Sequence, residues 1–278
     1  MTMNPDQRVV VVTGSSSGIG LETSLTLARN DFLTYATMRS LEKGATIKIL
    51  AEKEKLPIKV MQLDVTDSQS VNNAIQTIVS EAGRIDVLVN NAGYVLGGAF
   101  EDLAMNEIKA QYETNLFGLI RTTQAALPIM RKQKSGIIVN ISSANGIFGY
   151  PGISAYVSTK FAVEGLSESM AYELEPLGIK IVLIEPWFIK TNVVNAIVVA
   201  KKARDPGSPY SQMMQKLEVT SSEILTPVNA VSKVILEAVT SKNPNLRYLA
   251  GKDIETLVAN KKTMNDTEFH NMIEHLPR

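Results

Sequence analysis

The chain has 278 residues, of which 45% are hydrophobic, and its 28 Lys and Arg residues balance its 28 Asp and Glu residues. A net charge of zero gives no electrostatic reason to expect a nucleic-acid partner, and the absence of cysteine excludes disulfides and thiolate chemistry. The two histidines, His270 and His275, lie five residues apart without an acidic cluster, so we expect no metal site.

No targeting or membrane segment is visible in the sequence. Residues 1–8 lack the apolar core of a signal peptide. No apolar run approaches the roughly 20 residues that a membrane-spanning helix needs, so we expect a cytoplasmic protein. Strand and helix patterns alternate to about residue 250 without a linker-like stretch, which predicts one α/β domain over residues 1–278.

The first predicted elements are a strand, a glycine turn and a helix. Residues 8–13 are a short run rich in β-branched residues, typical of a buried strand. Gly14–Gly20 follows directly, and residues 21–29 have helical spacing, with Leu21 and Leu25 on one side. The N–H groups and dipole of a helix start attract anions, and glycine lets the backbone approach a pyrophosphate closely. The alternative is an ordinary strand-to-helix turn rich in glycine and serine.

The second predicted strand, residues 32–38, indicates which dinucleotide binds. It ends directly before Arg39, and no acidic residue stands there. An acid near this position would bind the ribose 2′-hydroxyl of NAD, whereas an arginine accommodates the 2′-phosphate of NADP. The sequence therefore favours NADP(H), with NAD(H) as the alternative. A surface arginine without a ligand would give the same pattern.

Tyr156 and Lys160 are four residues apart, which places both on one face of a helix. A free tyrosine has a pKa of about 10, and a nearby positive charge lowers that value. The pair therefore predicts a proton donor and acceptor for a carbonyl or an alcohol. The same spacing is common on solvated helix faces, so the pair alone is weak evidence for a catalytic site. The motifs upstream provide the stronger evidence.

Together these motifs resemble the short-chain dehydrogenase/reductase family. The family pattern T-G-x-x-x-G-x-G matches Thr13 to Gly20, N-N-A-G matches Asn90 to Gly93, and Y-x-x-x-K matches Tyr156 to Lys160. The match covers roughly residues 8 to 250.

The resemblance implies a catalytic tetrad of four residues: Asn115, Ser143, Tyr156 and Lys160. Ser142 is a rival for the serine role, but the S-x-x-G spacing to Gly146 favours Ser143. In such a tetrad, Tyr156 protonates the carbonyl oxygen and Ser143 hydrogen-bonds it. Lys160 lowers the tyrosine pKa and binds the nicotinamide ribose, and Asn115 holds a water that relays protons.

The resemblance also implies a cofactor site and a fold. The matching cofactor positions are Gly14, Ser16, Ser17, Gly18, Ile19, Gly20, Arg39, Asp64, Val65, Asn91, Gly93, Tyr156, Lys160, Pro186, Ile189 and Thr191. The expected fold is of the Rossmann type, a doubly wound parallel sheet with helices on both faces and the strand order 3-2-1-4-5-6-7. A homodimer or homotetramer would form on the helices containing Asn115 and Tyr156.

One position departs from the family pattern. The family usually has Pro-Gly after the sixth strand, and here Trp187 follows Pro186. An indole at this point could narrow or cap the substrate pocket, could rotate away and close its wall, or could be a core aromatic without substrate contact.

Several boundaries follow from local signals. Thr66 and Gln69 are placed as a capping box at the start of the third helix. A long helix over Ser154–Glu175 ends at Pro176-Leu177-Gly178. Residues 192–226, with Met213 and Met214, are expected to cover the substrate, and residues 252–278 form a polar, partly helical C-terminal extension. Further candidate pocket walls are Tyr94, Phe148 and Tyr150.

The leading hypothesis is an NADP(H)-dependent oxidoreductase that reduces a small-molecule carbonyl or oxidises an alcohol, since the cofactor supplies hydride and the protein supplies orientation and proton transfer. One alternative is an epimerase or dehydratase that uses the same bound cofactor. Another is a dinucleotide-binding sensor without catalysis, which the presence of Ser143, Tyr156 and Lys160 disfavours.

Overall fold

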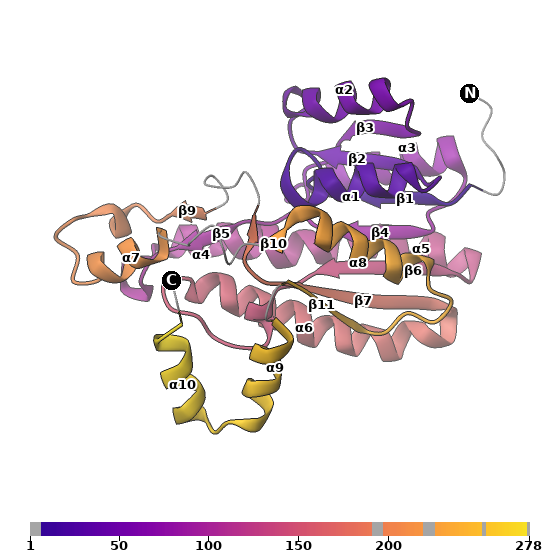
Figure 1. The fold of residues 1–278 in the computed structure, drawn as a ribbon. Coiled ribbons are helices and arrows are strands. Elements are labelled where there is room, and N and C mark those ends of the chain that lie inside the picture. The colour runs from indigo at the N-terminus through magenta and orange to yellow at the C-terminus, as the bar shows by residue number, and fades with distance from the viewer. Residues whose placement is uncertain (1–6, 191–196, 219–225, 252–253, 277–278) are drawn as a thin grey trace.

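The computed structural model describes residues 7–190, 197–218, 226–251 and 254–276, and a seven-stranded parallel sheet lies at its centre (Figure 1). The strands follow the order β3-β2-β1-β4-β6-β7-β11, and each neighbouring pair is parallel. Numbered within this sheet, the order is 3-2-1-4-5-6-7. The structure therefore confirms the doubly wound Rossmann-type fold that the sequence predicts.

The sheet strands are β1 (Val9–Val12), β2 (Leu33–Met38), β3 (Ile58–Gln62), β4 (Val87–Asn90), β6 (Gly136–Ile141), β7 (Ile179–Pro186) and β11 (Arg247–Ala250). The helices are α1 (Gly18–Arg29), α2 (Ala45–Glu54), α3 (Ser68–Ala82), α4 (Met105–Tyr112), α5 (Gly118–Gln133), α6 (Ser154–Leu174), α7 (Ser211–Glu218), α8 (Val228–Thr240), α9 (Ile254–Thr263) and α10 (Asp266–Glu274). Two short strand pairs lie outside the main sheet: β5 (Val95–Gly97) with β9 (Ile197–Val199), and β8 (Ile189–Lys190) with β10 (Thr226–Pro227).

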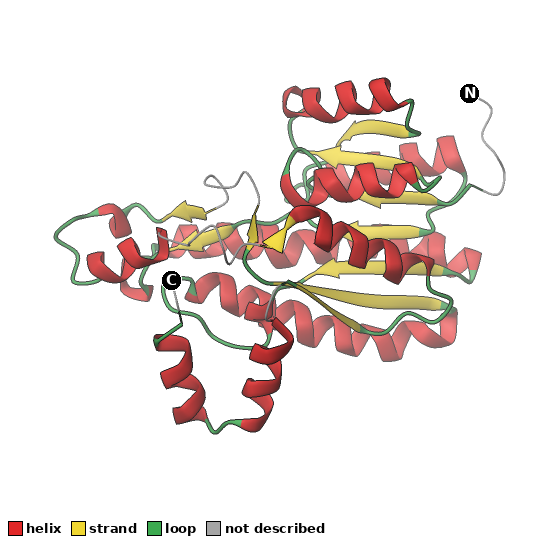
Figure 2. Cartoon of the chain, viewed as in Figure 1, coloured by secondary structure: helices red, strands yellow, loops and turns green. Residues whose placement is uncertain are grey.

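The four valines of β1 show why helices cover both faces of the sheet. Val9 and Val11 pack in one hydrophobic cluster with α3, α5 and α6, whereas Val10 and Val12 pack in another with α1 and α8. All four side chains are fully buried. Successive strand residues point to opposite faces, so a continuous apolar strand needs a helical layer on each side. Figure 2 shows these two layers of helices around the strands.

The order of the strands also determines where a ligand can bind. The chain moves outward from β1 through β2 to β3 and then returns to place β4 against the other side of β1. The direction of winding therefore reverses between β1 and β4. In open α/β sheets, ligands bind in the crevice outside the carboxyl ends of the strands at this reversal.

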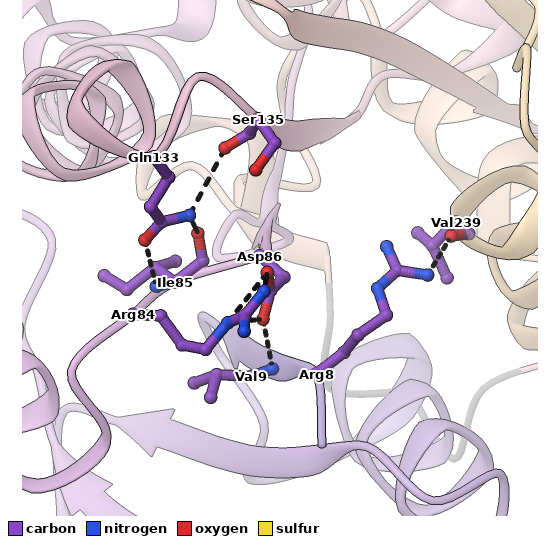
Figure 3. Close-up of polar contacts among 8 residues, drawn as sticks. All are labelled: Arg8, Val9, Arg84, Ile85, Asp86, Gln133, Ser135 and Val239. Carbon is purple, nitrogen blue, oxygen red and sulfur yellow. Dashed lines mark hydrogen bonds and ion pairs between the residues drawn. The ribbon is translucent and has the colours of Figure 1, made fainter. Parts of the chain in front are cut away.

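The amino ends of the strands are held by a separate set of polar contacts (Figure 3). The buried Asp86 carboxylate accepts a hydrogen bond of 2.7 Å from the Val9 backbone N–H and forms an ion pair with Arg84. Gln133, at the end of α5, bonds both the N–H and the C=O of Ile85. These contacts hold β1, β4 and α5 together at the edge opposite the expected ligand site. We therefore assign this edge a structural role.

The predicted capping box at the third helix is wrong by one residue. Helix α3 begins at Ser68, and the Asp67 side chain accepts a hydrogen bond from the backbone N–H of Gln69. The Thr66 hydroxyl instead donates to Asp64. A carboxylate caps a helix start as well as a threonine hydroxyl does, and Thr66 is engaged elsewhere.

The long helix ends as predicted. Helix α6 stops at Leu174, a 3₁₀ turn over Glu175–Leu177 follows, and Gly178 takes a positive φ of 78°. A Cβ on Gly178 would lie 2.2 Å from the Lys134 carbonyl oxygen. Glycine is therefore required here both for the left-handed conformation and for the close approach of two backbone segments. In the described ranges, no helix combines the length and apolar character that crossing a membrane would require.

Trp187 lies in an aromatic cluster after β7. Its side chain is 5% exposed, and its ring centroid lies 5.3 Å from that of Phe148, 5.7 Å from that of Tyr150 and 4.2 Å from that of Phe188. Phe188 itself has a positive φ of 38°, which is uncommon for a bulky residue. Of the alternatives for the indole, the structure favours packing within the protein.

The C-terminal segment forms a helical hairpin that covers this cluster. Leu257 of α9 and Phe269 of α10 are buried with Trp187, and the Phe269 ring centroid lies 5.5 Å from that of Phe148. The partly helical extension expected from the sequence is thus two helices with an apolar inner face. Residues that are remote in sequence bury the tryptophan together.

Replacing Trp187 should therefore destabilise the fold. We expect Trp187→Ala to lower the free energy of unfolding by about 3–5 kcal/mol, as large-to-small changes of buried aromatics do. Phe100→Ala is the matched control, because that ring is 74% exposed and its loss should stay within about 0.5 kcal/mol. Denaturant titrations of both variants measure the difference. A loss at Trp187 no larger than that at Phe100 would contradict the packing role.

Candidate active site

The glycine turn between β1 and α1 is closed tightly against the end of β4. Gly14 has a φ of 70°, and a Cβ on it would lie 2.9 Å from the Ala92 Cα atom. A Cβ on Gly20 would lie 2.4 Å from both the Gly14 carbonyl oxygen and the Asn91 side-chain nitrogen. Such contacts cannot be accommodated without moving backbone. Both positions therefore require glycine for this turn to form.

Thr13 and Asn91 hold the turn in place. The Asn91 side-chain amide donates to the carbonyl oxygens of Thr13 and Gly14, at 2.9 and 3.2 Å. The Thr13 hydroxyl accepts from the backbone N–H groups of Asn91 and Ala92, both at 3.0 Å. Asn91 thus joins the carboxyl ends of β1 and β4, where the sheet reverses its winding.

The start of α1 fits an anionic group. Ser17 is the N-cap residue and makes no side-chain capping hydrogen bond. The first N–H groups of a helix have no partner within the helix, so here they are available to a phosphate, which the helix dipole also favours. Ser17 is exposed, and Ser16, Gly18 and Ile19 are partly exposed. This turn therefore has the accessible N–H donors and the close backbone that a dinucleotide pyrophosphate needs.

Arg39 and Asp64 lie just beyond the carboxyl ends of β2 and β3. Arg39 is exposed, and no described residue forms a hydrogen bond or an ion pair with its guanidinium group. Asp64 accepts hydrogen bonds through Oδ1 from the N–H and hydroxyl of Thr66. Val65 is buried, and its carbonyl oxygen accepts from Arg121. The structure thus places these predicted residues along the same edge of the sheet as the glycine turn.

Asn115 lies in a single π-helical turn, Glu113–Phe117, that joins α4 to α5. Such turns are rare and occur often at functional sites. Its buried side chain accepts from the Tyr94 N–H at 3.1 Å and donates to the Tyr94 carbonyl at 2.9 Å. It also donates to the Thr159 hydroxyl of α6 at 3.3 Å. A Cβ on Gly93 would lie 3.2 Å from the Asn115 side-chain oxygen, so Gly93 lies directly against this residue.

Ser143 and Tyr156 come together from the loop after β6 and from the first turn of α6. The Ser143 hydroxyl contacts the Pro186 carbonyl at 3.4 Å and accepts from the Asn145 N–H at 3.1 Å. Burial raises the pKa of Tyr156 above its ordinary value of 10, and a hydrogen bond with Ser143 lowers it by less. The phenol is therefore protonated at neutral pH.

Lys160 is buried behind the tyrosine. Its ammonium donates to the Ile141 carbonyl oxygen at 2.6 Å and lies 5.5 Å from the centre of the Tyr156 ring. Burial lowers the pKa of Lys160 to about 8, against an opposing effect of Glu164. The expected lowering of the tyrosine pKa is not found here. Burial of the phenol is the largest cause of the shift, and it raises the pKa of Tyr156.

Other predicted residues have more varied surroundings. Pro186 ends β7 and contacts Ser143 through its carbonyl, and Ile189 in β8 is partly buried. Thr191 lies outside the described residues, as do residues 192–196 and 219–225 of the expected substrate-covering segment. The Ser142 hydroxyl is buried and has no hydrogen-bond partner in the described chain. Ser142 therefore does not share the contact that Ser143 has with Tyr156.

Three charged residues near this site were missed in the sequence. Glu164 of α6, Glu185 of β7 and Arg247 of β11 meet below the Ser143 loop, with the Arg247 Nε atom 3.1 Å from Glu164 and 3.5 Å from Glu185. Glu164 lies one helical turn beyond Lys160, and Glu185 is the second-last residue of β7, a strand that is apolar except for Lys180 and Glu185. Both were visible as acids on predicted buried elements, but Arg247 is far away in the sequence.

Comparisons with known proteins agree with this geometry. The family model of short chain dehydrogenases matches residues 8–202. An uncharacterized oxidoreductase of Bacillus subtilis, YusZ, is 37% identical over 257 residues, which cover 90% of this chain and 91% of that protein. A 3-ketodihydrosphingosine reductase of Bacteroides thetaiotaomicron is 33% identical and covers 92% of each chain.

Solved structures give the same result. A short-chain dehydrogenase from Streptomyces avermitilis superposes with a TM-score of 0.84 at 31% identity, covering 98% of this chain and 97% of that one. The structure of ElxO with bound NADP has a TM-score of 0.77, also at 31% identity, covering 90% of this chain and 99% of that one. The sheet order, the glycine turn and these matches together show that this chain belongs to the short-chain dehydrogenase/reductase family of oxidoreductases.

Proposed function

We propose that this protein is an NADP(H)-dependent oxidoreductase that reduces a carbonyl or oxidises an alcohol, with Tyr156 as the proton donor and acceptor. One arrangement supports the proposal: Ser143 interacts with the Tyr156 phenol, and the Lys160 ammonium lies 5.5 Å from the centre of the same ring. This trio lies at the carboxyl end of β6, beside the end of β4 that holds the glycine turn. A proton donor and a dinucleotide site are thus adjacent.

The residues divide the chemistry between them. A bound nicotinamide would supply the hydride. The Tyr156 phenol, kept protonated by its burial, gives its proton to the substrate oxygen during reduction. Ser143 donates a hydrogen bond to the same oxygen and orients it. The Lys160 ammonium stabilises the resulting phenolate by its charge.

The cofactor would be held along the carboxyl edge of the sheet. The N–H groups at the start of α1 would bind the pyrophosphate, Asp64 and Val65 would contact the adenine, and Arg39 would bind the 2′-phosphate. Asn91, Gly93, Pro186 and Ile189 would line the nicotinamide side. The Arg39 guanidinium is exposed and has no partner among the residues that the structure describes, which supports the choice of NADP(H), as does the NADP bound to ElxO.

The substrate is proposed to be an apolar carbonyl or alcohol larger than a short acid. In the described part of residues 192–226, Met214 is buried in a cluster with Leu96, Leu103 and Ala155, and Ala155 directly precedes Tyr156. The surroundings of the tyrosine on this side are thus apolar. The relative named as a 3-ketodihydrosphingosine reductase supports reduction of a keto group.

Removing the Tyr156 hydroxyl should abolish most turnover. We expect Tyr156→Phe to bind NADPH with unchanged affinity and to lose about 10²–10⁴-fold in kcat, the range for positioned acid catalysis. Tyr112→Phe is the control, because that phenol also bonds α6, through Ser158, without facing Ser143. NADPH absorbance with a panel of apolar ketones measures kcat. A Tyr156→Phe enzyme retaining more than about a tenth of wild-type kcat would exclude the role.

Arg39 should determine the choice of cofactor. Losing a charge-assisted hydrogen bond costs roughly 1.5–3 kcal/mol, so Arg39→Ala should weaken NADPH binding about 10- to 150-fold. NADH affinity should barely change. Lys48→Ala, which removes an exposed charge from the neighbouring α2, controls for long-range electrostatics. Equal weakening of both cofactors, measured by fluorescence titration, would show that Arg39 does not bind the 2′-phosphate.

A homo-oligomer built on α5 and α6 belongs to the same proposal. Phe161 and Tyr172 of α6 are 46% and 75% exposed, and Phe117, directly before α5, is 47% exposed. Exposed aromatics on neighbouring elements are typical of subunit contacts. Light scattering should report a dimer or tetramer, and Phe161→Glu should shift it towards monomer. Phe100→Glu, away from these helices, should not, and a monomeric wild type would refute the assignment.

A further inference from the structure

Two buried carboxyl groups lie directly behind the proposed site. Glu164 on α6 is 8% exposed and Glu185 on β7 is 1% exposed. The Oε1 atom of each has no hydrogen-bond partner among the described residues. Burying a carboxylate oxygen without a hydrogen bond is costly, because the protein interior stabilises charge less well than water does. The two Oε1 atoms therefore need a hydrogen-bond donor or a proton.

The charged groups around the pair only partly supply it. Arg247 of β11 lies 3.1 Å from Glu164 Oε2 and 3.5 Å from Glu185 Oε1, but it also bonds the exposed Glu168 of α6 at 2.9 Å. Lys160 lies one turn before Glu164 on α6 and interacts with its charge. The charge of Lys262, on α9, has a smaller effect on Glu185. One guanidinium therefore faces three carboxyl groups.

A single proton satisfies the two unpartnered oxygens together. A protonated carboxyl has one O–H donor. The two side chains meet at the same atom, Arg247 Nε, at 3.1 and 3.5 Å. Glu185 is the more deeply buried of the two and the one farther from the arginine, so the proton resides there. Glu164 then lies between Arg247 on one side and the shared proton on the other.

The pair also touches the machinery of the proposed reaction. A Cβ on Gly146 would lie 2.8 Å from Glu164 Cγ and 2.8 Å from Ser142 Oγ, so the Ser143 turn rests directly on Glu164. Glu185 precedes Pro186, whose carbonyl oxygen contacts Ser143. Glu164 faces Lys160 from the next turn of the same helix.

Building on the proposed function, we propose that Glu164 is a positioning residue that keeps Lys160 protonated, and that a proton shared with Glu185 allows Glu164 to remain charged in the interior. Neither carboxyl touches substrate or cofactor in this role; Glu164 acts through the lysine. The directions of the pKa shifts agree. The Glu164 charge raises the pKa of Lys160 against burial, leaving it at about 8. Burial first, and then Glu164, raise the pKa of Glu185 to about 8.

The first test is the pH profile of Glu164→Gln. This change removes the charge that raises the Lys160 pKa. The pH at which activity and NADPH affinity fall to half should therefore decrease by about one pH unit, and activity at pH 8 should be roughly fivefold below that of the wild type. Glu164→Asp keeps the charge, so its activity should fall at nearly the same high pH as that of the wild type. Glu168→Gln removes a charge from the same helix and from Arg247, and the pH at which its activity falls should not move. An unchanged pH of activity loss in Glu164→Gln would overturn the positioning role.

The second test is independent of catalysis and addresses the shared proton. A carboxyl with a raised pKa stabilises the fold fully below its unfolded value of 4.5, and that contribution is lost as pH rises towards about 8. Glu185→Gln mimics the protonated form and cannot lose a proton. Its melting temperature relative to wild type should therefore rise between pH 5 and 8 and level off above. A difference that stays constant with pH would refute the shared proton.

The outcomes separate the two proposals. If wild-type protein shows no NADPH-dependent turnover with any carbonyl or alcohol but the Glu185→Gln melting difference rises with pH, the proposed function fails while the shared proton stands. If turnover is normal but neither the activity of Glu164→Gln nor the melting difference depends on pH as expected, the inference about Glu164 fails and the function stands. Should Glu164→Gln not fold, Glu164→Asp and Glu185→Gln still decide.

Discussion

The close contact between the glycine turn and the end of β4 is the constraint on which the rest of the site depends. Asn91 bonds two carbonyl oxygens of the turn, and Gly20 approaches the Gly14 carbonyl so closely that no side chain fits between them. This contact joins β1 to β4 where the sheet reverses its winding. It therefore aims the N–H groups of α1 at the edge where the ends of β4 and β6 also present their loops.

The proton chemistry proposed here depends on burial rather than on the lysine alone. At a surface, a lysine beside a tyrosine would lower the phenol pKa. In this interior, desolvation raises the pKa of Tyr156 and lowers that of Lys160, so both groups shift towards their neutral forms. Glu164 opposes the shift at the lysine. A buried acid pair behind the site is thus a physical complement to a buried lysine within it.

The tryptophan after β7 links the site to the end of the chain. Trp187 packs against Phe148 from the loop after β6, and α9 and α10 cover both. Tyr156 adjoins the same cluster. The C-terminal hairpin therefore buries the residues that support the Ser143 loop, although it contributes none of the residues assigned to the reaction.

The sequence by itself determined the fold and predicted most residues of the candidate site, because those features depend on local patterns. Continuous β-branched runs, as at Val9–Val12, require burial on both faces, and the glycine spacing and Tyr-x3-Lys pair are read within a few residues. It could not decide the capping of α3, where Asp67 and Thr66 compete for nearly the same role. Only the tertiary structure could place Trp187 in a packed cluster or bring Arg247 to Glu164, 83 residues away in the chain. Such pairings, and the direction in which the pKa of a buried group shifts, depend on which remote segments exclude water from that group. No local sequence pattern encodes this.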